Sequence, residues 1–216
     1  MIDTILPEPV KFGAHPILSG SLFVRQDVDV STVLIFVHPW TWLGGRGAIL
    51  DELAQTLAEK GHFACLTFDL RGAGKSGGWS TFTGNSEVHD VKAAVDFMHT
   101  RFPNKKTILV GYSAGACIGG SSASVCTIDG YVGIAYPCGL ISSFAFWAHP
   151  KQLGKYEGPK LLIHGDNDGF TSSSQLLQRM GAITNLTVCM LPGAGHFDIL
   201  GEPSIVEKIM EFARSP

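Results

Sequence analysis

The chain has 216 residues, a length that suits one compact domain. Hydrophobic residues make up 45% of it and charged residues 16%, which excludes a disordered chain. The formal net charge is −3 and the basic residues are not clustered, so the sequence argues against a nucleic-acid partner. The longest apolar runs are strand-length, well short of the ~20 residues of a membrane span, and no secretory signal is recognisable at the N-terminus.

The cysteine content predicts thiols rather than a disulfide framework. There are five cysteines, an odd number, and no two are spaced as Cys-x-x-Cys. Buried thiols in a reducing compartment explain this best, so we expect a cytoplasmic protein. His38 and His164 could each be a metal ligand, but no His, Cys or Asp cluster supports this. We interpret both histidines as loop anchors and expect no metal or other cofactor.

Strand-like and helix-like segments alternate along the chain. Strands are predicted over 17–24, 31–38, 62–68, 106–112, 130–136, 160–164 and 186–191. Helices are predicted over 46–60, 86–101, 114–124, 172–181 and 203–214, the first of them capped by Gly61. This rhythm predicts one α/β domain over 1–216, with a mostly parallel sheet covered by helices on both faces. In such sheets, ligands and chemistry gather at the carboxyl ends of the strands.

The segment 111–115 reads Gly-Tyr-Ser-Ala-Gly and lies between a predicted strand and a predicted helix. A sharp turn there strains the serine backbone and needs small residues on both sides, and it presents the serine at a helix N-terminus. Ser113 is therefore the candidate nucleophile. The alternative is that Ser113 merely caps the following helix. Chance matches to this pattern are common, so the strand-before, helix-after context carries the hypothesis.

Candidate partners for this serine follow two later strands. Asp166 and Asp168 come directly after the 160–164 strand, and His196 follows the 186–191 strand. The chain order Ser, Asp, His is the order of a nucleophile–acid–base triad in α/β-hydrolases. Asp168 is the preferred acid, with Asp166 as its competitor or a turn cap. Asp198 is too near the histidine in sequence, and we interpret it as a cap.

Five motifs along nearly the whole chain resemble the α/β-hydrolase superfamily. More closely, they resemble its small, nearly capless members related to dienelactone hydrolases and compact esterase-like hydrolases. In that superfamily the acid is usually the fourth residue of Gly-x-x-Asp, which corresponds to Asp168. The motifs are Val-His-Pro with Gly-Gly (37–39, 44–45), Asp-Leu-Arg-Gly-Ala-Gly-Lys-Ser (69–76), Gly-Tyr-Ser-Ala-Gly (111–115), His-Gly-Asp-Asn-Asp (164–168) and Gly-Ala-Gly-His-Phe (193–197).

An oxyanion hole is expected beside the serine. Its first donor should be the backbone N–H of Ala114, the residue after the nucleophile. The resemblance places the second donor two residues after His38, at Trp40. The common family pattern there is His-Gly, but this chain has Pro39, which lacks an N–H. Trp40 must then donate, with Thr41 as the alternative.

A short cap-like insertion is expected at about 138–158, so the pocket should be open. Aromatic and apolar residues of the insertion and the strand-end loops predict a site for a small apolar acyl or aromatic group. Each of these residues could instead simply pack its loop. The expected substrate-binding residues are Trp42, Tyr112, Cys138, Leu140, Phe144 and Trp147.

The expected function is that of a serine hydrolase acting on a small-molecule carboxylic ester or thioester through an acyl-enzyme. Two alternatives remain open. One is a ligand-binding or receptor-like protein that keeps the triad but turns over little substrate. The other is a lyase or isomerase that uses the triad for acid–base chemistry. The sequence does not indicate an oligomeric state.

Residues 72–77 read Gly-Ala-Gly-Lys-Ser-Gly and imitate a nucleotide-binding loop. A P-loop needs a glycine where this chain has Asp69. A dinucleotide-binding loop opens directly into a helix, with an acidic residue at the end of the next strand. Here a polar loop follows, and the next strand ends at the serine turn. We interpret the segment as a structural turn beside the active site.

Overall fold

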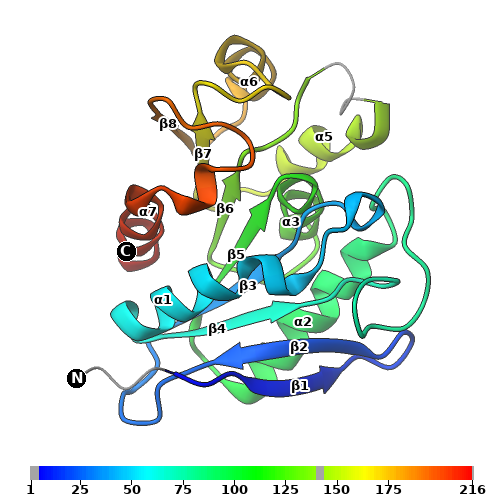
Figure 1. Ribbon diagram of the computed structural model, residues 1–216, viewed down its shortest axis with the longest axis vertical. Helices are drawn as coiled ribbons and strands as arrows, with labels where there is room; N and C mark the ends of the chain where they lie inside the picture. The colour runs from blue at the N-terminus through cyan, green and yellow to red at the C-terminus, as the bar shows by residue number, and fades with distance from the viewer. Residues whose placement is uncertain (1–4, 140–143, 216) are drawn as a thin grey trace.

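The computed structural model describes residues 5–139 and 144–215, within which eight strands form one sheet (Figure 1). Their order is β1-β2-β4-β3-β5-β6-β7-β8, with β1 and β2 antiparallel to their neighbours and the others parallel. The central strands β3 to β7 are buried almost throughout because helices cover both faces of the sheet. The bounds are β1 Glu8–Phe12, β2 Leu18–Phe23, β3 Thr32–Val37, β4 Phe63–Phe68, β5 Lys106–Tyr112, β6 Gly130–Ile134, β7 Lys160–Gly165 and β8 Leu186–Leu191.

Two apolar cores sandwich the sheet. Helices α1 (Asp51–Gly61) and α7 (Pro203–Arg214) pack one core, and α2 (Glu87–Arg101) and α3 (Ala114–Ala123) pack the other (Figure 1). The predicted α/β class, mostly parallel sheet and two-sided helical cover are confirmed. Shorter elements are α5 (His149–Leu153), α6 (Ser173–Met180), η1 (Thr41–Leu43), η2 (Gly47–Leu50) and η3 (Ile199–Gly201).

The sequence analysis missed strand β1. Its sequence Glu-Pro-Val-Lys-Phe carries a proline and two charges, which disfavour a central strand. β1 lies at the sheet edge, pairs with β2 alone and is mostly exposed, and an edge strand tolerates both features. The missed strand extends the sheet on the side remote from β8.

The predicted 46–60 helix was wrong in detail at both ends. It begins as the 3₁₀ turn η2 and becomes α-helical only at Asp51. Gly61 is the last helical residue, and His62 adopts the left-handed cap conformation with φ 59°. Glycine is needed at 61 for space, because a Cβ there would overlap the ring of Phe63.

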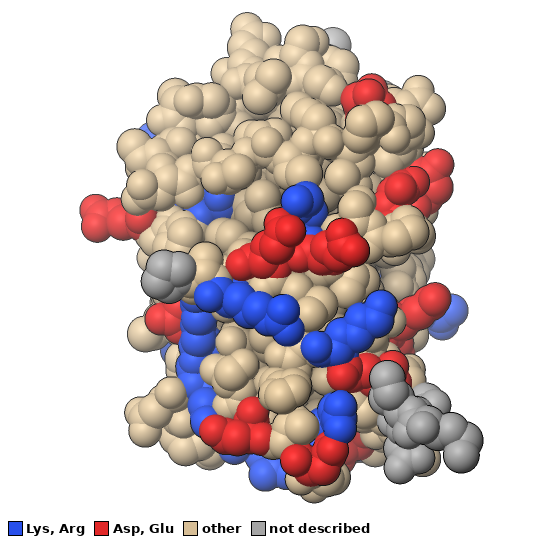
Figure 2. Space-filling view, turned by 90° about the vertical axis from the view of Figure 1, so that its left-hand side faces the viewer, with Lys and Arg blue, Asp and Glu red and all other residues tan. Residues whose placement is uncertain are grey.

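The face shown in Figure 2 carries Lys and Arg side chains interspersed with Asp and Glu, and neither sign forms a single large patch. Pairing of opposite charges is one cause, as with Lys208 and Glu211 on α7, whose side chains lie 2.9 Å apart. Among residues 5–139 and 144–215, no helix has the length and apolar character needed to cross a membrane.

Candidate active site

The turn after β5 holds Ser113 in a strained conformation, with φ 55° and ψ −127°. Its backbone N–H donates to the Ile134 carbonyl oxygen at 2.9 Å, which ties the turn to the neighbouring strand β6. Both flanking glycines are required by space. A Cβ on Gly111 would overlap the backbone of α3, and one on Gly115 would overlap the carbonyl oxygens at the end of β3. The sequence therefore places the hydroxyl at the N-terminus of α3.

Three side chains from separate strand ends form one hydrogen-bonded chain. Ser113 Oγ lies 2.9 Å from His196 Nε2, and His196 Nδ1 lies 2.7 Å from Asp168 Oδ2. An ionised carboxylate only accepts, so Nδ1 carries the proton and Nε2 is left to accept from the serine hydroxyl. The histidine and aspartate side chains are almost fully buried.

The carboxylate of Asp168 is held on both oxygens. Oδ1 accepts the backbone N–H groups of Phe170 and Thr171 at 2.7 and 3.0 Å, while Oδ2 faces His196. Burial alone raises the pKa of Asp168, but the His196 hydrogen bond and charge and the two N–H groups lower the pKa overall. The group therefore stays ionised at neutral pH and can stabilise a positively charged imidazole.

The other two candidate carboxylates have structural partners. Asp166 accepts the Gly193 N–H at 2.6 Å and so joins the loop after β7 to the loop after β8. Asp198 accepts the Gly195 N–H at 2.6 Å and closes the turn that carries His196. Their interpretation as turn caps agrees with these bonds, and among the three aspartates only Asp168 is hydrogen-bonded to the histidine ring.

The two expected oxyanion donors flank the same cavity as the serine. Trp40 and Ala114 both line it, whereas Thr41 does not. His38 fixes this loop, because its Nδ1 donates to the Pro39 carbonyl at 2.6 Å and its Nε2 accepts the Leu70 N–H at 3.0 Å. Burial lowers the pKa of His38 to about 4, so the ring is neutral. His38 is thus the loop anchor that was expected.

The cavity above Ser113 has a volume of about 560 Å³ and mostly apolar walls. Its polar side chains are those of Ser113, His196 and Tyr112, and no Asp, Glu, Lys or Arg lines it within the described residues. The apolar wall is formed by Pro39, Trp40, Leu43, Ile49, Phe82, Ala114, Pro137, Phe144, Ala145, Phe146, Phe170, Phe197 and Leu200.

Two of the expected substrate-binding residues reach this cavity. Phe144 lines its wall, and so does Tyr112, whose hydroxyl is engaged with the backbone carbonyl oxygen of His196. Leu140 lies outside the described residues.

The other three do not line it. Trp42 and Trp147 are exposed, and Trp42 packs edge-on against Phe82 with 5.9 Å between ring centroids. Cys138 is buried, and its backbone N–H donates to Thr171 Oγ1 at 2.8 Å, which joins the insertion to the Asp168 loop. The expectation that the side chains of Trp42, Cys138 and Trp147 contact substrate in this cavity was therefore wrong.

Sequence reasoning missed several wall residues, among them Phe170 and Phe197. The Phe170 ring lies 4.5 Å from the His196 ring and 5.5 Å from the Phe197 ring, measured between centroids. Both follow triad members closely in sequence, at Asp168 and His196, and that position was the available signal. They place an apolar shield on one side of the imidazole.

A second serine–histidine pair lies under the insertion. Ser121 Oγ on α3 lies 2.6 Å from His149 Nδ1 on α5, and His149 Nε2 donates to the Thr83 carbonyl at 2.7 Å. Burial lowers the pKa of His149, although its backbone hydrogen bonds oppose this. Both side chains are buried away from the cavity above Ser113, so the pair serves to fasten the insertion to α3.

The glycine-rich loop 72–77 is organised by Asp69. The Asp69 carboxylate accepts the N–H groups of Lys75 at 2.9 Å and of Gly47 at 3.0 Å. A Cβ on Gly74 would overlap this carboxylate. These glycines therefore let backbone approach an internal carboxylate, as expected of a structural turn.

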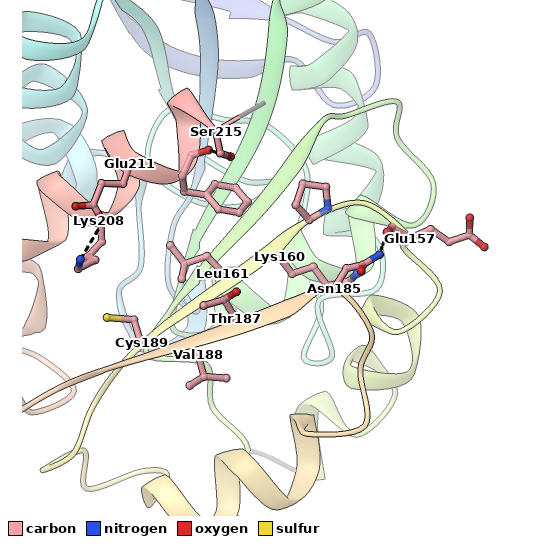
Figure 3. Close-up of a pocket in the computed structure, with 12 residues that line it drawn as sticks. Glu157, Lys160, Leu161, Asn185, Thr187, Val188, Cys189, Lys208, Glu211 and Ser215 are labelled. Carbon is pink, nitrogen blue, oxygen red and sulfur yellow. Dashed lines mark hydrogen bonds and ion pairs between the residues drawn. The ribbon is translucent and has the colours of Figure 1, made fainter.

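A second cavity of about 860 Å³ lies beside β7, β8 and the end of α7 (Figure 3). Several of its polar groups are engaged with neighbouring protein groups. The Lys160 amine donates to the Gly158 and Thr184 carbonyl oxygens at 2.8 and 2.9 Å, and Lys208 pairs with Glu211 (Figure 3). Burial lowers the pKa of Lys160. No member of the serine–histidine–aspartate chain lines this cavity.

Comparison with known proteins agrees with this geometry. A family model described as the alpha/beta hydrolase fold matches residues 33–125, which run from β3 through the serine turn to the end of α3. The chain has the α/β-hydrolase fold. None of the curated protein sequences is significantly similar to it.

Solved structures with the α/β-hydrolase fold superpose over almost the whole chain. An alpha-beta serine hydrolase homologue from Coxiella burnetii has a TM-score of 0.79 at 22% identity, covering 99% of this chain and 97% of that one. A serine hydrolase without a lid from Xanthomonas campestris has 0.79 at 20%, covering 97% and 96%. An esterase from Pyrococcus furiosus has 0.75 at 21%, covering 96% and 92%. At these identities the likeness concerns the fold.

Proposed function

We propose that this protein is a serine hydrolase that cleaves a carboxylic ester or thioester through an acyl-enzyme intermediate. The observation that carries the proposal is the hydrogen-bonded chain Ser113–His196–Asp168 at the floor of an apolar cavity. The solved serine hydrolases and esterase with the same fold support it by analogy.

In the proposed mechanism each group has a role. His196 Nε2 takes the proton as Ser113 Oγ attacks the carbonyl carbon, and it later returns a proton to the leaving group. Asp168 holds the imidazole in the tautomer with a proton on Nδ1 and stabilises the imidazolium. The backbone N–H groups of Ala114 and Trp40 stabilise the anionic oxygen, and losing one such donor typically costs about 3 kcal/mol of transition-state stabilisation. Water then attacks the acyl-enzyme by the reverse sequence.

The cavity favours a small apolar acyl or aromatic group. Its walls carry rings from several segments, among them Phe82, Phe146 and Phe170, and no Asp, Glu, Lys or Arg lines it within the described residues. A cavity of about 560 Å³ is within the ordinary range for small-molecule sites. We therefore infer an uncharged substrate.

A fluorophosphonate probe tests the nucleophile directly. We expect it to label Ser113, and Ser113→Ala to abolish labelling and lower ester turnover by about a million-fold, as for other serine hydrolases. Ser121→Ala is the matched control, because Ser121 also contacts a histidine but lies away from the cavity. It should keep labelling and turnover.

The outcome also separates other uses of the fold. A folded protein that ignores the probe and hydrolyses no activated ester would refute the proposal. Ligand-dependent thermal stabilisation without product would then indicate a binding protein, and a product formed without net hydrolysis would indicate a lyase or isomerase.

A further inference from the structure

Exposed apolar side chains concentrate around the opening of the active-site cavity. The described residues include thirteen large apolar side chains that are exposed, and six of them line this one cavity. Single exposed apolar residues are ordinary, but a contiguous group marks an interaction surface. The six are Leu43, Ile49, Phe82, Phe144, Phe170 and Phe197. Together with Trp42, which packs on Phe82, we call them the mouth rim.

The side chains of the mouth rim are more exposed than side chains that only line a pocket need to be. Leu43 is 77% exposed, Phe144 82% and Phe197 78%, so most of each side chain faces solvent. Trp42 is 60% exposed and lies outside the cavity wall. These residues come from five separate connections that follow strands, and all but Trp42 line the same cavity. Covering such a group of exposed apolar side chains with an apolar surface is favourable, because apolar area is removed from water.

Charge argues for an uncharged partner. No Asp, Glu, Lys or Arg is among the rim residues or the other described residues that line the cavity. The exposed charged residues nearest to the rim in sequence are Asp198, next to Phe197, and Arg46 and Glu52, each three residues from Ile49. Two of these are acidic and one is basic, so the rim offers no electrostatic attraction to an anionic surface.

The position of the rim limits what can cover it. A second copy of the chain, or a protein seated permanently on the rim, would cover the cavity above Ser113. A lipid surface would instead present substrate at that opening. Tryptophan and phenylalanine are also the side chains that insert at the boundary of a lipid surface.

We propose that the mouth rim docks the protein on an uncharged lipid surface, from which an apolar ester enters the cavity. The part of this proposal in which an ester enters the cavity rests on the proposed function. Binding to the lipid surface does not itself require turnover.

The test is flotation of the Ser113→Ala protein with phosphatidylcholine vesicles, so that no hydrolysis occurs. We expect the protein to float with the vesicles, and neither added phosphatidylglycerol nor lower salt to strengthen binding appreciably. In the same background, Trp42→Ser should weaken partitioning by about tenfold, because one large apolar side chain no longer inserts. Leu43→Ser should act alike.

Trp79→Ser is the matched control. Trp79 is 90% exposed but neither lines the cavity nor belongs to the rim, so its loss should leave partitioning unchanged. Absence of flotation, flotation only with anionic lipid, or equal weakening by Trp42→Ser and Trp79→Ser would overturn the proposal. So would a dimer in solution that Trp42→Ser dissociates. Failure of docking would leave probe labelling of Ser113 intact, so the two proposals fail separately.

Discussion

The phenolic hydroxyl of Tyr112 donates a hydrogen bond to the backbone carbonyl oxygen of His196, with 2.8 Å between the two oxygens. The bond joins the residue just before the proposed nucleophile, Ser113, to the residue proposed as the base. Burial raises the pKa of Tyr112 to about 12, so the hydroxyl remains a donor at neutral pH. The tyrosine thus holds the histidine loop at a fixed height above the serine turn.

Tyr112→Phe should misplace the base without removing it. We expect kcat for a dissolved activated ester to fall about tenfold, KM to change little, and the free energy of unfolding to fall by about 1 kcal/mol. Tyr156→Phe is the control, because its hydroxyl also donates to a backbone carbonyl, that of Ile128 at 3.3 Å, away from the cavity. If both variants keep the wild-type kcat, Tyr112 has no positioning role.

Comparing Asp168→Asn with Asp166→Asn should show which of the two neighbouring carboxylates acts as the acid. The amide preserves the size of the side chain but no longer holds the histidine tautomer, and the corresponding change in a serine protease lowers kcat about ten-thousand-fold. We expect a loss of similar order. Asp166→Asn retains an oxygen that accepts the Gly193 N–H, so its kcat should stay within about threefold of wild type. The opposite ranking would identify Asp166 as the acid.

Gly115→Ala should destabilise the fold. The new Cβ would overlap the carbonyl oxygens of Val37 and His38, and backbone cannot move aside as a flexible side chain can. We expect a loss of at least about 3 kcal/mol in urea unfolding, with activity lost in parallel. Gly201→Ala, where nothing lies within 4 Å of the new Cβ, should change stability by less than about 1 kcal/mol. Equal free energies of unfolding for the Gly115→Ala and Gly201→Ala variants would contradict the close approach of α3 to β3.

Mild acid should lower stability through buried histidines. The pKa of His38 is lowered to about 4 by burial, whereas an unfolded histidine titrates near 6.5. Between these values the unfolded chain binds more protons, so the free energy of unfolding falls as pH falls, by about 3 kcal/mol from this group. His149, whose pKa is also lowered, acts in the same direction.

Urea unfolding at pH 7.5, 6 and 5 checks this slope. Asp168 contributes in a different window, because its lowered pKa makes its stabilisation disappear only below the usual carboxyl range. His38→Gln removes one titrating ring and should flatten the slope. A wild-type stability that does not change between pH 7.5 and 5 would contradict neutral burial of these rings.

A charged acyl group should be rejected by the cavity. Burying a carboxylate among apolar walls without a partner is costly. We expect kcat/KM for a p-nitrophenyl hemisuccinate to be at least about a hundredfold below that for the butyrate, which is similar in length. Comparable values would indicate a cation near the acyl site, in conflict with the lining residues.

The convergence of three side chains at one edge of the sheet could be predicted because it depends on chain order and strand ends. Each of Ser113, Asp168 and His196 follows an apolar strand, and a parallel sheet brings such ends to one edge. The roles of Gly111 and Gly115 follow from the same turn. These inferences need only the local residue pattern and the sheet topology, and the sequence predicts both.

The cavity wall could not be predicted in the same way. Trp42 and Phe146 both lie in short helical segments of connections that follow strands, yet one faces solvent and the other lines the cavity. The direction in which such a side chain points depends on contacts between segments that are distant in sequence. No periodicity in the sequence indicates these contacts. Strand β1 was missed because an edge position relaxes the rules that identify central strands. The left-handed cap at His62 also breaks the usual preference for glycine.

The carboxylate of Asp69 gives the glycine-rich loop its own resident anion. A phosphate loop becomes ordered when its ligand arrives, but here the negative charge that gathers the backbone amides is part of the chain. The loop therefore needs no bound phosphate to hold its backbone in place, because a carboxylate of the chain itself accepts the Lys75 N–H group.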